Sequence, residues 1–249
     1  MELVWLTALG VGGATILGAA LGFVFKDLSH KFSDIVLAFA AGVMLAAAVI
    51  GLILPSMEYG SLITTVAGIF CGAACLNLMD KVVPHLHRLS GADQEAHPEQ
   101  TETLNKVLLF VMAIAIHNLP EGIAAGVGFG TGNDGEAITI AVGIALQNIP
   151  EGMVIIAPML AAGMNRGRTL IAALLTGVVE VFGTLLGFFA VSISTAVLPF
   201  ALAFAGGTML YVISDEMIPE THAHGEERGA TYALLAGFAL MLVMSHYLG

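Results

Sequence analysis

The chain has 249 residues, of which 57% are hydrophobic and only 11% are charged. A soluble domain carries about a quarter charged residues, so this composition excludes an ordinary soluble protein. The formal net charge of −11 argues against nucleic acid as a partner. Apolar runs of about 20 residues recur along the chain, which is the length that crosses the hydrocarbon of a bilayer. We therefore expect an all-α polytopic membrane protein embedded in a lipid bilayer.

Polar clusters divide the chain into eight expected transmembrane helices, which together form a single domain over residues 1–249. The spans are approximately 3–25, 34–55, 61–79, 104–129, 135–162, 167–190, 195–218 and 229–247. The longest polar connection, approximately 80–103, follows the third span. Asp34, which follows Ser33 where the second span begins, is interpreted as a helix cap.

The basic residues indicate the orientation of the chain, because all eight fall in alternate connections between or beside these spans. They are Lys26, Lys31, Lys81, Arg88, Lys106, Arg166, Arg168 and Arg228. Connections rich in Lys and Arg are typically cytoplasmic. We therefore expect a cytoplasmic loop at 80–103 and both termini outside the cytoplasm.

One polar motif occurs twice in this apolar chain, as HNLPEG at residues 117–122 and as QNIPEG at residues 147–152. The two copies are 30 residues apart. At a helical rise of roughly 1.5 Å per residue, about fifteen residues reach from the middle of the membrane to its surface. About fifteen more residues, on the next helix, reach back to the middle. The copies are therefore expected near the bilayer midplane, on antiparallel fourth and fifth helices. Polar groups on such paired, proline-containing helices indicate a transport site.

Each copy presents its polar side chains on one helix face, because residues three and four apart are neighbours on a helix. The side chains are His117, Asn118 and Glu121 in the first copy, and Gln147, Asn148 and Glu151 in the second. Imidazole nitrogen with carboxylate and amide oxygens suits Zn²⁺, Fe²⁺, Mn²⁺ or Cd²⁺ better than Cu⁺, which prefers thiolates.

The motif prolines, Pro120 and Pro150, have no N–H to donate and crowd the carbonyl four residues earlier. We expect helices 4 and 5 to be broken by these prolines around a central metal site, each break freeing a carbonyl. Gly122 and Gly152 are expected to relax the turn that follows each break.

Glu180 is the only ionisable residue of the stretch 174–191 in the sixth span, and it follows Glu151 by 29 residues. Insertion scales assign about 2.5–3.5 kcal/mol to an acidic group at a helix centre. A bound divalent cation would stabilise this glutamate and the two motif glutamates as carboxylates. The alternative is that all three are protonated and hydrogen-bonded to Asn118, Asn148 and Gln147.

These motifs on the fourth and fifth of eight helices, with a glutamate mid-way along the sixth, resemble the ZIP family of divalent-metal transporters in its compact prokaryotic form. The resemblance implies uptake of a divalent metal, Zn or else Cd, Fe or Mn, from outside into the cytoplasm by alternating access. The metal would be the transported substrate, with one or two ions bound, and no cofactor would act as a catalyst. The resemblance also implies a plasma (inner) membrane location, a homodimer, and movement of helices 1, 4, 5 and 6 against the others.

The resemblance also assigns roles to individual residues. The family's primary transport site matches His117, Glu121, Gln147 and Glu151, and an adjacent second site matches Asn118, Asn148 and Glu180. A methionine of helix 2 lies against the primary site in the family, and Met44 occupies that place here. A packing role explains Met44 equally well, since methionine fills gaps in cores.

Two further clusters lie at the expected cytoplasmic helix ends. The first contains Asp80, His85 and His87. The second contains Asp215, Glu216, Glu220, His222, His224, Glu226 and Glu227. Histidines beside carboxylates are typical of a metal exit or regulatory site. Solvated loop ends that carry extra histidines explain both clusters equally well.

Three other functions remain open beside metal uptake. The glutamates could form a proton or cation relay, or the site could sense metal without flux. An intramembrane metalloprotease would need a motif such as His-Glu-x-x-His on one helix. Residue 118 is Asn and no second histidine lies four residues after His117, so we do not expect an enzyme.

Overall fold

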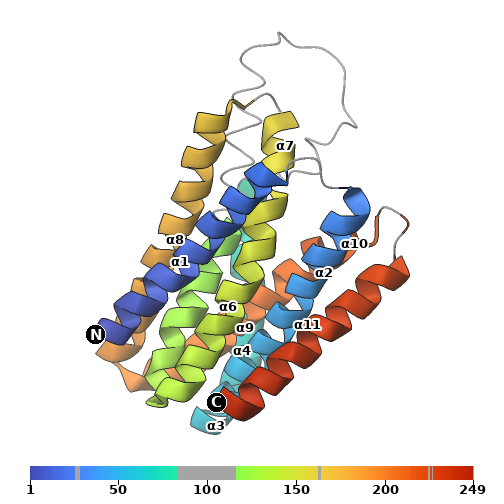
Figure 1. Ribbon diagram of the computed structural model, residues 1–249. Coiled ribbons are helices and arrows are strands. Elements are labelled where there is room, and N and C mark those ends of the chain that lie inside the picture. The colour runs from blue at the N-terminus through green and yellow to red at the C-terminus, as the bar shows by residue number, and fades with distance from the viewer. Residues whose placement is uncertain (26–28, 83–115, 162–163, 224, 226, 249) are drawn as a thin grey trace.

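The computed structural model describes residues 1–25, 29–82, 116–161, 164–223, 225 and 227–248. These residues form a bundle of tilted helices, and none of them belongs to a strand (Figure 1). Both termini lie toward the same end of the bundle, as expected for an even number of spans (Figure 1). The predicted all-α fold is confirmed.

Seven helical stretches among the described residues are long and apolar enough to cross a membrane. They are Glu2–Val24, His30–Tyr59, Leu62–Met79, Asp134–Val154, Arg166–Ile193, Thr195–Thr221 and Glu227–Leu248. The remaining expected span, 104–129, lies partly outside the described residues, and its described part is helical over residues 116–127. The chain is therefore a multi-pass membrane protein, as predicted.

Five spans are single helices, and two contain a wider π-helical turn. The single helices are α1 (Glu2–Val24), α4 (Leu62–Val82), α6 (Asp134–Val154), α8 (Arg166–Ile193) and α11 (Glu227–Leu248). The second span consists of α2 (His30–Ala46), the π-helix η1 (Ala47–Ile53) and α3 (Leu54–Tyr59). The seventh consists of the 3₁₀-helix η4 (Thr195–Val197), α9 (Leu198–Val212), the π-helix η5 (Ile213–Met217) and α10 (Ile218–Thr221). The short elements η3 (Gly128–Thr131) and α7 (Ile156–Ala161) follow segment 116–127 and α6.

The helices pack as two groups. The first, which we call the site group, contains α1, segment 116–127, α6 and α8, with α1 lying between α6 and α8. The second, the flanking group, contains the second and seventh spans with α4 and α11, in which α2 pairs with α11 and α4 pairs with α9. The groups meet chiefly where α2 lies against α6. The site group carries both sequence motifs.

The predicted helix breaks at the motif prolines are not found. The α6 helix is continuous through Pro150, and segment 116–127 is continuous through Pro120. A proline removes one backbone hydrogen bond, but in lipid the neighbouring peptide groups have no water to bond instead. The rest of the helix therefore keeps its own hydrogen bonds on both sides of the proline.

The departures from regular α-helix lie instead in the flanking group, where the sequence analysis did not expect them. Each π-helix is followed closely by a proline, η1 by Pro55 and η5 by Pro219. The ring of a proline crowds the carbonyl four residues earlier, which lies inside the π-helix in both cases. A π-turn widens the backbone at that point, so the span continues without a break.

Asp34 is not a helix cap, contrary to the prediction. The second span begins four residues earlier, and its N-cap is Ser29, whose hydroxyl accepts a hydrogen bond from the Phe32 N–H at 3.3 Å. Asp34 therefore lies inside α2, where its side chain is buried. Sequence reasoning placed the start of the span too late because His30 and Lys31 look like loop residues.

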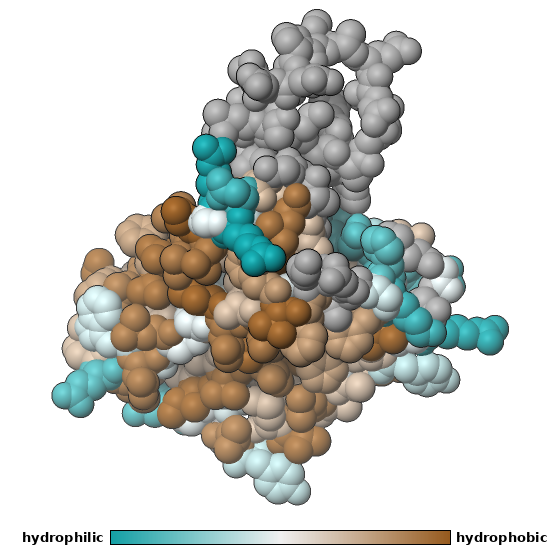
Figure 2. Space-filling view, turned by 45° about the horizontal axis from the view of Figure 1, so that its top comes forward, coloured by the Kyte–Doolittle hydropathy of each residue, from teal (hydrophilic) through white to brown (hydrophobic). Residues whose placement is uncertain are grey.

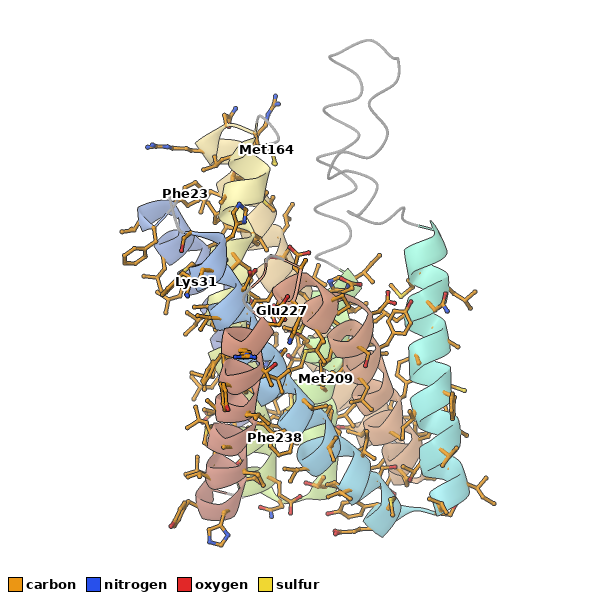
Figure 3. All side chains as sticks on the ribbon, turned by 90° about the vertical axis from the view of Figure 1, so that its right-hand side faces the viewer. Phe23, Lys31, Met164, Met209, Glu227 and Phe238 are labelled. Carbon is orange, nitrogen blue, oxygen red and sulfur yellow. The ribbon has the colours of Figure 1, made fainter. Side chains whose placement is uncertain are left out.

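Hydrophobic side chains cover much of the visible surface of the described helices, and hydrophilic residues gather toward the helix ends (Figure 2). The exposed apolar side chains include Leu6, Ile63, Phe70, Phe182 and Leu235. In a side view of the bundle, Lys31, Met164 and Glu227 lie in its upper part and Phe238 in its lower part (Figure 3). This pattern fits an apolar belt that faces lipid.

The close pairing of α2 with α11 depends on glycine. A Cβ added at Gly42 would overlap the backbone carbonyl of Leu234, and one added at Gly237 would overlap that of Phe39. We expect Gly42→Ala to lower the free energy of unfolding by about 1–3 kcal/mol, because backbone cannot give way as a flexible side chain can. Thermal unfolding of the purified protein in detergent measures this. Gly13→Ala is the matched control, since an added Cβ there meets no atom within 4 Å, and equal melting temperatures would contradict the expectation.

Candidate metal site

The motif residues come together inside the site group, where segment 116–127, α6, α8 and α1 meet. The buried polar side chains at this point are Thr15, Asn118, Glu121, Gln147, Asn148 and Glu180. Glu180 and Gln147 are 0% exposed, and Glu121 is 1% exposed. The buried side chains of segment 116–127, α6 and α8 therefore lie together, which is consistent with the single depth that the spacing of the motifs predicts.

The Glu180 carboxylate accepts hydrogen bonds from three different elements. The Thr15 hydroxyl donates to its Oε1 at 2.7 Å and to its Oε2 at 2.9 Å. Asn118 Nδ2 donates to Oε1, and Asn148 Nδ2 donates to Oε2 at 2.9 Å. The contacts of Glu180 with Asn118 and Asn148 are those expected if the glutamates are protonated and hydrogen-bonded to the motif amides.

Glu121 makes the corresponding contact within the motif pair, where Gln147 Nε2 donates to its Oε1 at 3.0 Å. Four other buried oxygens of the motifs have no hydrogen-bond partner among the described residues. They are Glu121 Oε2, Gln147 Oε1, Asn148 Oδ1 and Glu151 Oε1. A buried acceptor without a partner is costly, and a cation is the simplest group that would satisfy several oxygens at once.

The three glutamates lie close to one another, and His117 lies close to Glu151. Carboxylates this close would repel one another if all of them were ionised. Within the described part of the chain, no three His, Cys, Asp or Glu side chains are arranged to hold a metal ion by themselves. A metal bound here therefore needs amide oxygens as well, or a movement of the side chains.

His117 extends from the motif toward the flanking group. Its Nε2 lies 2.9 Å from Oε1 of Glu216, which belongs to the π-helix η5. The sequence analysis placed His117 with Glu121 but did not connect it with Glu216, which lies 99 positions later in the chain. Only the packing of the seventh span against segment 116–127 brings these two side chains together.

The glycines of the two motifs let neighbouring helices approach closely. A Cβ added at Gly122 would overlap the backbone carbonyl of Glu180, and one added at Gly152 would overlap that of Thr15. The first motif is thus packed against α8 at Glu180, and the second against α1 at Thr15. Small residues let helix backbones approach closely, so packing accounts for both glycines, and their effect on the following turn stays a prediction.

Comparison with known proteins identifies the family of the chain. Residues 79–245 match the sequence profile of the family described as ZIP Zinc transporter. The chain belongs to the ZIP zinc transporter family. It is 40% identical to the zinc transporter GufA of Myxococcus xanthus over 247 residues, which cover 96% of each chain. It is 37% identical to the zinc transporter ZIPB of Bordetella bronchiseptica over 95% of this chain and 78% of that one. It is 30% identical to the zinc transporter ZIP11 of Homo sapiens, over 95% and 94%.

The remaining predicted residues of this ZIP protein lie in an apolar cluster, near the end of α10 or outside the described residues. Met44 is buried in the apolar core of α2, so a role as metal ligand stays a prediction. His222 bonds the Ile218 carbonyl through Nδ1 at 2.9 Å and the Thr231 hydroxyl through Nε2 at 3.2 Å, and so connects α10 with α11. Glu220 is exposed.

The predicted cytoplasmic metal site is not tested by these contacts. His85, His87, His224 and the side chain of Asp80 lie outside the described residues. The bonds of His222 fit a structural role for its ring. An exit or regulatory site at these residues therefore stays a prediction.

Thr15 is a member of this buried polar cluster that the sequence analysis did not name. A signal was present, because Thr15 is a polar residue half-way along a first span rich in Gly and Ala, at the depth expected for the motifs. Threonine is common in membrane helices, where its hydroxyl bonds its own backbone, so the signal was weak.

Removal of the Asn148 side chain should destabilise the site group. Asn148 Nδ2 donates to Glu180 and, at 3.3 Å, to the carbonyl of Val11. We expect Asn148→Ala to lower the free energy of unfolding by about 1–3 kcal/mol, since it leaves buried acceptors without a donor. Thermal unfolding in metal-free detergent solution measures the change. Asn77→Ala, at an exposed position of α4, is the control and should unfold like the wild type.

Proposed function

We propose that this ZIP protein takes up Zn²⁺ from outside into the cytoplasm through the buried cluster of carboxylates and amides. The observation that carries the proposal is that Glu121, Glu151 and Glu180 lie near one another inside a membrane-embedded bundle, beside buried oxygens that no described group satisfies. A divalent cation would offset both the repulsion and the unmet hydrogen bonds. The relatives named as zinc transporters support the same substrate.

The ligand chemistry supports a range of divalent metals. The primary site would use His117, Glu121, Gln147 and Glu151, and a second adjacent ion would use Asn118, Asn148 and Glu180. An amide oxygen at Gln147 is a weaker ligand than an imidazole, and it favours a broader range that includes Cd²⁺, Fe²⁺ and Mn²⁺. Binding of a second ion requires Glu180 to exchange some of its present hydrogen bonds for the metal.

The packing supports transport by alternating access, with the site group moving against the flanking group. Inside each group, glycines bring helix backbones into contact, as at Gly152 with Thr15 and at Gly42 with Leu234. Where the groups meet, glycines lie against side chains of the other group. An example is Gly143 of α6, which lies against the Met241 side chain of α11. Contacts through flexible side chains can slide, whereas backbone contacts resist displacement.

Two polar contacts cross between the groups at different depths. The Tyr59 hydroxyl donates to the Thr131 carbonyl at 3.1 Å, near the end where the termini lie. The His117–Glu216 contact lies at the level of the motif. Both would have to break or change as the groups move, and a metal that binds His117 would compete directly with Glu216.

The location and orientation belong to the same proposal. The described basic residues, Lys31, Arg166, Arg168 and Arg228, lie at or near the helix ends opposite the termini, which supports a cytoplasmic location for that face and outside termini. We place the protein in the plasma (inner) membrane. A homodimer stays a prediction, which light scattering of the purified protein in detergent would test.

A proton or cation relay is the second candidate for the same residues. The hydrogen bonds of Glu121 and Glu180 to amides are compatible with protonated glutamates. Amide groups do not pass protons on readily, however, and they separate Glu121 from Glu180 in the described contacts. This arrangement favours ion binding over a relay, and family membership favours flux over sensing.

Uptake into proteoliposomes tests the proposal directly. We expect saturable Zn²⁺ uptake by the wild type, and a loss of more than about tenfold in Glu151→Ala, since even partners of metal ligands contribute 10–100-fold. The size of the loss in Glu180→Ala measures the contribution of the second site. Glu58→Ala, at an exposed position of α3, is the matched control and should retain uptake.

The same assay with Cd²⁺, Fe²⁺ and Mn²⁺ defines the range of substrates. Absence of uptake of all four metals by vesicles that are shown to be tight would contradict the transport proposal and favour the relay or a sensor.

Labelling of introduced cysteines tests the orientation. In a variant without Cys71 and Cys75, we expect a cysteine at position 2 or 134 to react with an impermeant maleimide added to intact cells. A cysteine at position 166 or 228 should react only after the membrane is opened, because the basic connections are cytoplasmic. Labelling of positions 166 and 228 in intact cells would reverse the proposed orientation.

A further inference from the structure

We propose that Thr15 of α1 is a positioning residue of the transport site. Its hydroxyl holds the Glu180 carboxylate in the orientation from which that carboxylate fixes the amide groups of Asn118 and Asn148. Thr15 would act through Glu180 and would not bind the metal itself. The inference rests on the transport function proposed above.

The geometry of the Thr15 hydroxyl is unusual for the threonines of this bundle. Its Oγ1 lies 2.7 Å and 2.9 Å from the two oxygens of Glu180, so it spans the carboxylate. Five other buried threonines donate to a carbonyl of their own helix. These are Thr139, Thr169, Thr176, Thr184 and Thr208. Thr15 instead gives its hydrogen bond to a side chain 165 positions away, on another helix.

The carboxylate in turn determines how the motif amides are presented. Asn118 and Asn148 each direct their Nδ2 toward Glu180, one to each carboxylate oxygen. Because the oxygen of an amide points away from its NH₂ group, both carbonyl oxygens are directed away from Glu180. Asn148 Oδ1 is buried and has no hydrogen-bond partner among the described residues. A buried oxygen without a hydrogen-bond partner is available to a cation.

The backbone of α1 is fixed at the same level, so Thr15 has a firm base. The Thr15 carbonyl is packed against Gly152, and Gly18 is packed against the carbonyl of Ile149. Asn148 also donates to the Val11 carbonyl at 3.3 Å. The glycine of the second motif therefore meets α1 at Thr15, just as the glycine of the first motif meets α8 at Glu180.

This correspondence indicates the role of Thr15. Each motif is packed, through its glycine, against a residue whose side chain turns into the shared polar cluster. On α8 that residue is the acceptor Glu180, and on α1 it is the donor Thr15. At 2% exposure, the Thr15 side chain is shielded from bulk solvent. Loss of this donor should let the carboxylate turn and release the amides.

Three substitutions separate the hydroxyl from the shape of the side chain. Thr15→Val keeps the volume and removes the donor, and Thr15→Ser keeps the donor. Thr184→Val is the matched control, because Thr184 is buried one helical turn after Glu180 and donates only to the Glu180 backbone carbonyl, at 2.9 Å. The readouts are the kinetics of Zn²⁺ uptake by the full-length protein in proteoliposomes, and the rise in melting temperature that Zn²⁺ produces in the purified protein.

We expect Thr15→Val to lower the ratio of maximal rate to KM for Zn²⁺ by about tenfold or more, as for other residues that orient metal ligands. The Zn²⁺-induced rise in melting temperature should shrink in parallel. Thr15→Ser should restore most of both, and Thr184→Val should behave like the wild type in both.

Several outcomes would overturn the positioning role. One is a Thr15→Val protein whose uptake and Zn²⁺ response equal those of Thr184→Val. Another is a Thr15→Val protein that is less stable without metal but keeps the full Zn²⁺ response, which indicates packing alone. A third is a Thr15→Ser protein as impaired as Thr15→Val. If Thr15→Val does not fold, the Zn²⁺ response of Thr15→Ala against Thr15→Ser decides in the same way.

Failure of the transport proposal gives a different result. A wild type that takes up no Zn²⁺ contradicts transport. A Zn²⁺-induced stabilisation that still depends on the Thr15 hydroxyl would then support the positioning of a binding site without flux.

Discussion

The structure depends on the need to satisfy one fully buried carboxylate inside a bundle that faces lipid. Glu180 is 0% exposed, and its two oxygens accept hydrogen bonds from Thr15, Asn118 and Asn148. An unpaired charge in such a place would cost several kcal/mol, so the donors must come from wherever the chain can supply them. They come from α1, segment 116–127 and α6, and Glu180 thereby joins all four elements of the site group. The hydrogen bonds of the polar site therefore also hold these helices together.

Small residues make this arrangement possible. Gly122 and Gly152 bring the motif helices into backbone contact with α8 and α1, which places Glu180 and Thr15 within reach of each other. The site group is thus joined by backbone contact and by hydrogen bonds, and it meets the flanking group through side chains such as that of Met241. A rigid unit that carries the site beside a surface that can slide is the mechanical requirement of alternating access. The π-helices next to Pro55 and Pro219 place the irregular backbone in the flanking group instead.

Several features followed from the sequence because they depend on local pattern and on spacing. The apolar runs predicted the helical membrane fold, and the repeated motif predicted which side chains meet at one depth, since 30 residues is one helical climb and return. The predictions about proline failed for a physical reason. A proline excludes one hydrogen bond, but whether the helix breaks depends on what surrounds it, and here the helices stay continuous through Pro120 and Pro150. The start of α2 at His30, with Asp34 inside it, was missed for a similar reason.

The sequence by itself determined the class of protein, the family and the residues of the two motifs together with Glu180, because each of these is written in adjacent or regularly spaced positions. Only the tertiary structure decided which groups those residues contact. Thr15 reaches Glu180 over 165 positions and His117 reaches Glu216 over 99, and nothing local in the chain indicates either pairing. Such contacts are chosen by how the helices pack, which depends on the fit of whole surfaces and on the need to give every buried polar group a partner.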